Sequence, residues 1–194
     1  MTPLDIYLTG VGGQGIGLLS DLLSRAAMAA GYHAVGTDTH GLAQRGGTVV
    51  SHLRIGDARH RGPVIPQGRA NVAAALERLE AMRALNDMLA PSGRLFYCDA
   101  VYQPIAVRMG SGRYPETADI ASAAQVKKVS VTRIDVAALP DPKLQNTLLL
   151  SALIREGAIA EIRADHVVTA LKAVLKGPLL EANLALFLSE VGGK

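Results

Sequence analysis

The sequence has few of the residues that build disulfides, metal clusters and aromatic cores. It contains one cysteine, no tryptophan and two phenylalanines among its 194 residues. One cysteine excludes a disulfide framework within the chain, and also an iron–sulfur cluster or a cysteine-rich zinc site built from this chain alone. The scarcity of aromatics leaves an aliphatic, alanine-rich core, which is typical of layered helices and buried parallel strands.

Strong charge and long apolar runs are absent too. The formal net charge is +3 and there is no long basic run, so the composition does not predict a nucleic-acid-binding protein. No uninterrupted run of 18 apolar residues occurs, and no basic segment followed by an apolar stretch stands at the N-terminus. We therefore expect no membrane span or signal peptide, and a cytoplasmic, soluble, single-domain protein.

What remains is a regular alternation of strand and helix patterns. Short Val/Ile/Leu/Ala runs predict strands, and apolar residues spaced three and four apart predict the helices between them. The predicted strands are residues 4–9, 32–37, 48–55, 70–76, 94–98 and 129–135. The predicted helices among them are residues 18–30, 77–89 and 117–125, with a surface loop at 56–68 and a turn at 91–93. The first two strands and the helix between them form a βαβ unit.

Strand patterns stop before Pro142. Three helices are predicted over residues 143–156, 165–176 and 179–190, separated by Gly157 and by Gly177-Pro178. We expect one domain over residues 1–194, with an α/β body in 1–142 and C-terminal helices in 143–194 that pack on the body or on a partner. The predicted fold class is α/β: a Rossmann-like, mostly parallel sheet flanked by helices, with a helical C-terminal segment.

The first strand leads into a glycine-rich loop. Gly10, Gly12, Gly13 and Gly15 surround Gln14 within six positions, and a helix pattern follows. Such a strand–loop–helix presents backbone N–H groups and a helix N-terminus to an anion, typically a phosphate. The alternative is a tight turn whose glycines only let the strand and the helix pack closely.

The spacing Gly10-x-Gly12-x-x-Gly15 also fits the fingerprint of dinucleotide-binding proteins. Asp38 ends the second strand, roughly 20 residues further on, where such proteins place an acid on the ribose. A free-standing NAD(P) dehydrogenase is therefore an alternative function. The plainer interpretation of Asp38 is a solvated or helix-capping residue.

A second anion-accepting segment follows the second strand. Arg45 precedes Gly46 and Gly47, which places a guanidinium next to exposed backbone amides. We expect this segment at the C-terminal edge of the sheet, beside the first loop. Two such loops would suit a ligand with several phosphates, such as coenzyme A, and Arg54 is a further candidate for the same task. Alternatively, Arg45 braces a partner interface.

Acid–base and metal chemistry have weaker signals. His40 and His52 are candidates for a general acid or base, but such histidines more often form hydrogen bonds in a loop or an interface. Asp38 and His40 could share a metal ion, but no third ligand stands at a recognised spacing, so no metal site is predicted. Cys98 is expected to be buried and inert at a strand end. The sequence thus assigns no catalytic residue to this chain.

Together these segments resemble a known family. Gly10-Val-Gly-Gly-Gln-Gly15 and His40-Gly-Leu-Ala-Gln-Arg-Gly-Gly-Thr-Val-Val-Ser-His-Leu-Arg-Ile-Gly56 are similar to the gamma-type domain of 2-oxoacid:ferredoxin oxidoreductases, in particular to the small (beta) subunits of the indolepyruvate enzymes. The similarity continues through residues 75–83, 145–153 and 181–185. It therefore covers nearly the whole chain.

The resemblance implies oxidative decarboxylation of a 2-oxoacid, here indolepyruvate or another aryl pyruvate, to an acyl-CoA. It implies that thiamine diphosphate and the iron–sulfur clusters, which pass electrons to ferredoxin, belong to a large partner subunit, and that this chain is inactive alone. Coenzyme A, as cosubstrate, is expected at Gly10, Gly12, Gly13, Gln14, Gly15, Arg45, Gly46, Gly47 and Arg54. The alternatives are the NAD(P) dehydrogenase and a non-catalytic interaction module. The isolated chain is also a candidate to homodimerise through the face meant for its partner.

Overall fold

The computed structural model describes residues 3–40, 47–57, 62–102 and 113–193. One six-stranded sheet runs through the molecule in the order β2-β3-β1-β4-β5-β6. Its strands are β1 (Leu4–Val11), β2 (Ala34–His40), β3 (Thr48–Ile55), β4 (Ala70–Ala75), β5 (Leu89–Cys98) and β6 (Ser130–Ile134). All six predicted strands are therefore present, and β3 has the predicted bounds.

The sheet is mixed but mostly parallel, as predicted. β1, β4, β5 and β6 pair in parallel, whereas β3 is antiparallel to both of its neighbours, β1 and β2. β2 consequently runs in the same direction as β1, as a βαβ unit requires, but β3 lies between them. The C-terminal ends of the other five strands and the start of β3 therefore lie at the same end of the sheet.

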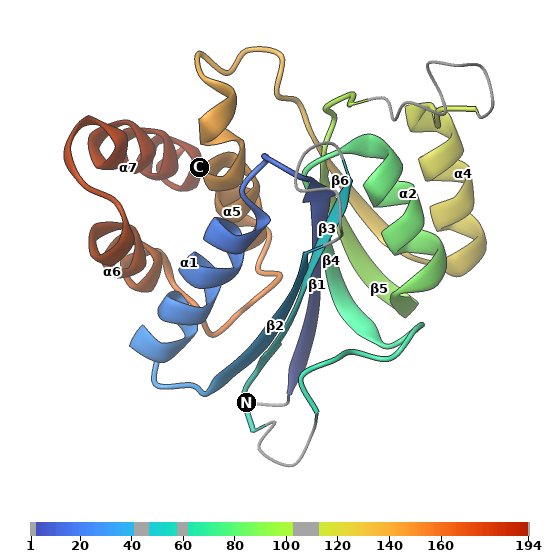
Figure 1. Cartoon of the computed structure of the whole chain (residues 1–194), viewed down its shortest axis with the longest axis horizontal. Helices are drawn as coiled ribbons and strands as arrows, with labels where there is room; N and C mark the ends of the chain where they lie inside the picture. The colour runs from blue at the N-terminus through green and yellow to red at the C-terminus, as the bar shows by residue number, and fades with distance from the viewer. Residues whose placement is uncertain (1–2, 41–46, 58–61, 103–112, 194) are drawn as a thin grey trace.

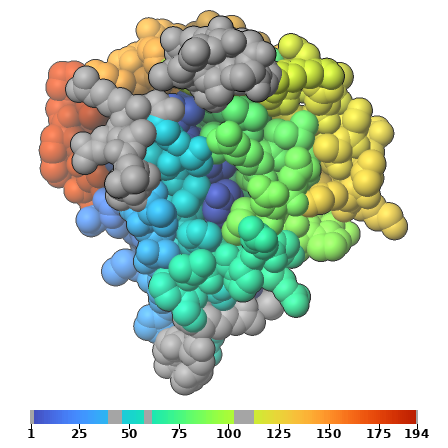
Figure 2. All heavy atoms as spheres, turned by 45° about the vertical axis from the view of Figure 1, so that its right-hand side comes forward, coloured from blue at the N-terminus to red at the C-terminus, as the bar shows by residue number. Residues whose placement is uncertain are grey.

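Helices cover both faces of the sheet (Figure 1). They are α1 (Ile16–Ala29), α2 (Arg78–Asp87), α4 (Thr117–Lys127), α5 (Gln145–Arg155), α6 (Ala164–Val174) and α7 (Gly177–Gly192), with a short 3-10 helix, η1 (Pro142–Leu144), before α5. α2 and α4 lie on one face, and α1, α5, α6 and α7 lie on the other. Figure 2 shows part of β1, in dark blue, visible between β3 (cyan) and α2 (green).

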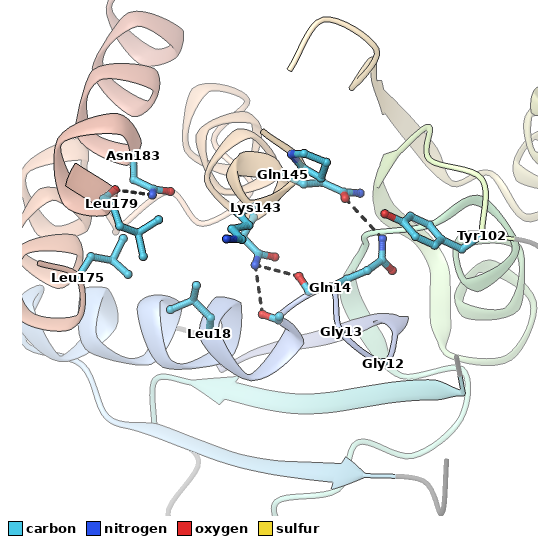
Figure 3. Close-up of a pocket in the computed structure, with 13 residues that line it drawn as sticks. Gly12, Gly13, Gln14, Leu18, Tyr102, Lys143, Gln145, Leu175, Leu179 and Asn183 are labelled. Carbon is cyan, nitrogen blue, oxygen red and sulfur yellow. Dashed lines mark hydrogen bonds between the residues drawn. The ribbon is translucent and has the colours of Figure 1, made fainter. Parts of the chain in front are cut away.

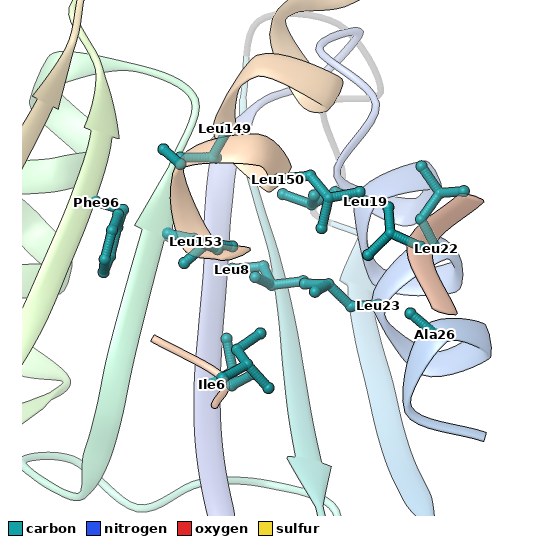
Figure 4. Close-up of a cluster of buried hydrophobic side chains, with 14 of the residues drawn as sticks. Ile6, Leu8, Leu19, Leu22, Leu23, Ala26, Phe96, Leu149, Leu150 and Leu153 are labelled. Atoms are coloured by element: carbon teal, nitrogen blue, oxygen red, sulfur yellow. The ribbon is translucent and has the colours of Figure 1, made fainter. Parts of the chain in front are cut away.

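Alternation along the strands divides the hydrophobic core into two clusters. Ile6, Leu8 and Phe96 belong to the cluster on the α1 side, where they lie among leucines of α1 and α5 (Figure 4). Ala73 and Leu95 belong to the cluster under α2 and α4. Both clusters are largely aliphatic and rich in alanine, as the composition predicted.

The C-terminal helices complete the larger cluster. Leu153 of α5, Leu171 of α6 and Phe187 of α7 are fully buried in it. The segment after Pro142 therefore shares a core with the α/β body. Across the described ranges, no helix is both long and apolar enough to cross a membrane.

Three local predictions differ from the structure. β2 continues to His40, beyond the predicted end at residue 37, so Asp38 lies within the strand and not at its end. The turn predicted at 91–93 lies inside β5, where the pairing with β4 is irregular and Ser92 has a φ of +62°. Pro91 lacks a backbone donor, so the turn interrupts the ladder within the strand instead of preceding it. Gly177-Pro178, predicted as a break, forms the start of α7, because proline is tolerated in the first turn of a helix.

Candidate functional site

The glycine loop connects β1 to α1 at the C-terminal edge of the sheet. The Gln14 N–H donates to the Val11 carbonyl oxygen (3.0 Å), which closes a tight turn. Gly13 and Gly15 have φ angles of +104° and +85°, which residues with a side chain rarely adopt. α1 begins at Ile16, so the predicted strand–loop–helix is present.

The Gln14 side chain turns inward and joins the ends of two strands. Its Oε1 accepts from the Val11 N–H (2.7 Å), and its Nε2 donates to the Leu76 carbonyl oxygen (2.8 Å), just beyond β4. The Gln145 side chain donates to the same carbonyl oxygen. Gly10 leaves room for this arrangement, because a Cβ there would lie 3.0 Å from Gln14 Oε1. Gly10 and the Gln14 side chain therefore hold the turn together, which is the packing alternative considered for the glycine loop in the sequence.

The N-terminus of α1 borders a cavity of about 400 Å³ (Figure 3). Gly15 is the N-cap, no described side chain caps it, and the first turn holds no acidic residue. The first N–H groups of a helix lack partners inside it, so this end carries a partial positive charge that favours anions. The cavity is lined by Gly12, Gly13, Gln14, Gly15, Leu18, Tyr102, Pro142, Lys143, Gln145, Asn146, Leu175, Leu179 and Asn183.

The far wall of the cavity comes from the C-terminal helices, which no motif singled out. Lys143 of η1 contributes a cation, and Asn183 of α7 contributes an amide. Asn146 of α5 donates from Nδ2 to the carbonyl oxygens of Gln14 (3.0 Å) and Gly15 (3.3 Å). The family resemblance over parts of α5 and α7 was the signal that could have found Asn146 and Asn183.

The second loop meets the first, as predicted. The Gly12 N–H donates to the Gly47 carbonyl oxygen (2.8 Å), which ties the glycine loop to the residue before β3. This N–H is therefore not among those open to a ligand. Arg45 and Gly46 lie outside the described residues, so their part in the site stays a prediction.

A buried carboxylate beside this junction was not predicted. Glu80 of α2 is 3% exposed. Its Oε1 accepts from the Thr48 hydroxyl (2.9 Å) and Arg83 (2.6 Å), and its Oε2 accepts from the Thr9 hydroxyl (3.2 Å). Glu80 therefore links β1, β3 and α2 near the point where the two loops meet.

Glu77 forms a second buried carboxylate at the start of α2. It accepts from the Glu80 N–H (2.9 Å), the Tyr102 N–H (3.4 Å) and the Tyr114 hydroxyl. Burial raises the pKa of the Glu77 carboxyl above its usual range. Two acidic residues three apart at the start of a helix pattern are a capping signal, but only the fold shows that both are buried.

Arg54 lies at the other end of the sheet, which contradicts its predicted place beside the glycine loop. In the β1–β3 register Val11 pairs with Thr48, whereas Asp5 pairs with Arg54. Six residues of extended strand separate Arg54 from the loop by about 20 Å. Its guanidinium donates to the Val64 carbonyl oxygen (2.9 Å) and lies 3.5 Å from the Asp5 carboxylate. Arg54 is therefore a structural residue here.

His52 and Cys98 also have structural settings. His52 Nδ1 accepts from the Ile65 N–H (3.1 Å), and its ring packs edge-on to Tyr7 with the centroids 5.2 Å apart. Burial, and then the Arg54 charge, lower the pKa of His52, so it is neutral at pH 7. Cys98 is fully buried at the end of β5, and burial raises the pKa of its thiol to about 12, as expected of an inert cysteine.

Asp38 and His40 lie on β2, the strand next to β3 at one edge of the sheet. Asp38 is exposed, and its Oδ2 would lie 3.8 Å from a Cβ built on Gly17, so it stands beside the first turn of α1. β3 separates it from β1. The His40 side chain is outside the described part of the chain.

Sequence comparison identifies relatives over nearly the whole chain. Residues 5–189 match the family described as pyruvate ferredoxin/flavodoxin oxidoreductase. The chain is 34% identical over 186 residues to indolepyruvate oxidoreductase subunit IorB of Archaeoglobus fulgidus, which covers 93% of this chain and 90% of that protein. It is 31% identical over 187 residues to the protein of that name from Methanothermobacter thermautotrophicus, which covers 94% and 93%.

Solved structures share the fold. Pyruvate oxidoreductase subunit PORC from Thermotoga maritima matches with a TM-score of 0.69 and 18% identity, over 99% of this chain and 97% of that one. A 2-oxoglutarate:ferredoxin oxidoreductase from Magnetococcus marinus, with 2-oxoglutarate, coenzyme A and succinyl-CoA bound, matches with a TM-score of 0.62 and 16% identity, over 100% of this chain and 32% of that one. With the family match over residues 5–189, the chain belongs to the pyruvate ferredoxin/flavodoxin oxidoreductase family.

Proposed function

We propose that the chain is the small subunit of a 2-oxoacid:ferredoxin oxidoreductase that acts on indolepyruvate or a related aryl pyruvate. The two archaeal IorB subunits, which align with it over nearly their whole length, support this. In this proposal a large partner subunit carries thiamine diphosphate and the iron–sulfur clusters and reduces ferredoxin. The complex works in the cytoplasm, and the isolated chain is inactive and able to homodimerise.

The junction of the two loops carries the proposal for this chain's own part. The bond between Gly12 and Gly47 joins the two loops, and Gly12 also lines the cavity at the uncapped end of α1, where Lys143 lies. Backbone donors, a helix N-terminus and a cation together favour a phosphate-bearing ligand. Coenzyme A is such a ligand, and it is bound in the Magnetococcus marinus enzyme that shares this fold.

The residues of this cavity would bind and orient coenzyme A. Gly13 and Gly15 would offer backbone donors to its phosphates, with Arg45 and Gly46 from the second loop. Bound coenzyme A would supply the thiol that accepts the acyl group. The described residues that line the cavity include no histidine, cysteine or carboxylate. In this proposal the redox chemistry belongs to the partner subunit.

An Arg45→Ala variant of the assembled enzyme tests this role. A charge-assisted contact to a phosphate is worth about tenfold in affinity, so the KM for coenzyme A should rise by about that factor with kcat unchanged. Arg25→Ala is the matched control, because Arg25 pairs with Asp21 on an exposed part of α1. Equal KM values for the two variants would contradict the coenzyme A role and favour the non-catalytic interaction module.

The NAD(P) dehydrogenase remains the second candidate, because Asp38 does stand beside α1. One observation counts against it: β3 separates β2, which carries Asp38, from β1. We expect no saturable binding in a fluorescence titration of the isolated chain with NADH. Saturation at micromolar NADH, lost in Asp38→Asn, would favour the dehydrogenase.

A further inference from the structure

β2 forms one edge of the sheet, and one side of its backbone is open. β3 pairs with it from Ala34 to His40, and no strand among the described residues lies on its other side. The Gly56 N–H donates to the His33 carbonyl oxygen (2.9 Å), so His33 and every second residue after it direct their backbone groups toward β3. The N–H and C=O groups of Ala34, Gly36 and Asp38 therefore point outward from the sheet.

The opposite edge of the sheet, β6, is protected in ways that β2 is not. β6 has five residues, one of them the charged Arg133, and Lys127 and Lys128 come just before it. β2 has seven residues, no proline and one charged side chain, Asp38. Edge strands of soluble proteins are normally kept short or charged, because an open strand pairs readily with another strand. β2 is thus the edge that is better suited to pairing.

One face of β2 is open as well as its edge. Ala34 packs against the core cluster on the α1 side, so alternation places Val35, Thr37 and Thr39 on the opposite face. The helices on that face are α2, which packs on β1, β4 and β5, and α4, which packs on β6 (Figure 1). Neither packs on β2. Val35 and Thr37 are accordingly only half-buried, and Thr39 is exposed.

A second copy of β2 matches this edge. A two-fold axis at Thr37 sets the two strands antiparallel and places Gly36 opposite Asp38 of the other copy, so outward backbone groups meet. On the open face the same axis pairs Thr37 with Thr37 and Val35 with Thr39, which are favourable cross-strand pairs. Each Asp38 carboxylate lies opposite a glycine and not opposite its own copy. The pairing therefore sets no like charges directly against each other.

We propose that two copies of the chain associate through β2, so that their sheets join across a two-fold axis at Thr37. Backbone hydrogen bonds between the two strands hold this dimer together. The inference rests on the homodimerisation in the proposed function, because it names the surface by which the isolated chain associates. None of the residues that line the glycine-loop cavity belongs to β2, so the dimer leaves that cavity outside the interface.

Cysteine cross-linking of the full chain tests the surface and its register. In Thr37→Cys the two new thiols face each other at a non-hydrogen-bonded pair, where the Cα atoms are about 4.5 Å apart and a disulfide can form. Thr132→Cys is the matched control, because Thr132 is also half-buried and lies on the other edge strand. Cys98 is fully buried, so it supplies no competing thiol.

On mild oxidation, Thr37→Cys should run as a disulfide-linked dimer on a non-reducing gel and Thr132→Cys as a monomer. In light scattering the wild type should have twice the chain mass of 20.3 kDa. Thr37→Lys should halve that value, because it sets two ammonium groups opposite each other, whereas Thr132→Lys should leave it unchanged.

A dimeric wild type in which Thr37→Cys does not cross-link, or cross-links no more than Thr132→Cys, would overturn the β2 surface. A monomeric wild type would overturn the homodimerisation as well. Cross-linking of Thr37→Cys to the large subunit in the assembled enzyme would assign this edge to that subunit instead. The proposed oxidoreductase function is overturned only by the separate failure of the large subunit to respond to the chain.

Discussion

Gly15 and Gly31 stand at the two ends of α1, and a side chain added at each position would have different surroundings. Gly15 and Gly31 have nearly equal φ angles, +85° and +84°. A Cβ on Gly15 would lie 2.6 Å from Asn146 Nδ2, whereas a Cβ on Gly31 would meet nothing within 4 Å. The pair therefore separates backbone strain from the contact that holds the loop.

Gly31→Ala should lower the free energy of unfolding by about 1–2 kcal/mol, the cost of a side chain in the left-handed region. Gly15→Ala should cost about 1–3 kcal/mol more, because it also displaces the Asn146 amide from two carbonyl oxygens. Urea denaturation of the two variants measures the difference. Equal losses would show that Asn146 does not support the loop.

The Cys98 thiol should be unreactive in the folded protein. It is fully buried and its pKa is about 12, so almost no accessible thiolate forms at pH 8. A disulfide reagent such as dithiobis-nitrobenzoate should label the chain in urea but not under native conditions. Rapid stoichiometric labelling of the native protein would contradict this assignment.

Glu77 predicts a pH dependence of stability. Burial raises its pKa in the folded state, so the folded chain binds this proton more tightly than the unfolded chain. The stabilisation that this proton binding gives the folded state is fully present below the pKa of Glu77 in the unfolded chain. It is lost as the pH rises through the pKa of Glu77 in the folded chain. Relative to Glu77→Gln, the wild type should therefore lose stability as the pH rises above about 4.5. Denaturation across pH 4 to 8 tests the sign, and a relative gain with rising pH would mean that Glu77 folds as a carboxylate.

At the scale of helices and strands, local sequence patterns predicted which elements form but not how they are arranged in the sheet. The six strands and the C-terminal helices follow from apolar periodicity, which is a property of neighbouring residues. The place of β3 between β1 and β2 depends on pairing between distant segments, and no short-range pattern specifies it.

The candidate site was likewise predictable only where it consists of local motifs. The two glycine-bearing loops were found because each is a local motif, and the Gly12–Gly47 bond confirms that they meet. Arg54 was misplaced because β3 is extended, so residues only six positions apart in sequence lie at opposite ends of the strand. The cavity wall from α5 and α7 was missed because Asn146 and Asn183 reach the cavity only when α5 packs on α1 and α7 packs on α5.

The shared core predicts that α7 stabilises the whole chain. Phe187 is fully buried, so Phe187→Ala should cost about 3–5 kcal/mol of unfolding free energy through lost burial and the cavity left behind. Leu188→Ala, one residue further on the same helix, should stay within about 0.5 kcal/mol, because Leu188 is 53% exposed. Single cooperative denaturation curves should show both shifts. A small effect of Phe187→Ala would mean that α7 is not integral to the core.

At the scale of the whole molecule, the cavity at the glycine loop is lined mainly by amide and aliphatic groups. The described residues that line its cavity offer amides, leucines, a tyrosine and a lysine, but no histidine, cysteine or carboxylate. Apolar side chains also remain exposed near this cavity: Val101 is 49% exposed, Tyr102 45% and Leu179 44%. Both features suit a subunit whose reaction takes place on a partner.

Reconstitution with the large subunit tests this claim most directly. The purified chain is titrated into a fixed amount of that subunit, and ferredoxin reduction is followed with indolepyruvate and coenzyme A. We predict no turnover by the chain alone, and activity that rises with added chain until the subunits reach a fixed ratio. Full activity of the isolated chain, or a large subunit whose coenzyme A-dependent rate is unchanged by the chain, would contradict the account.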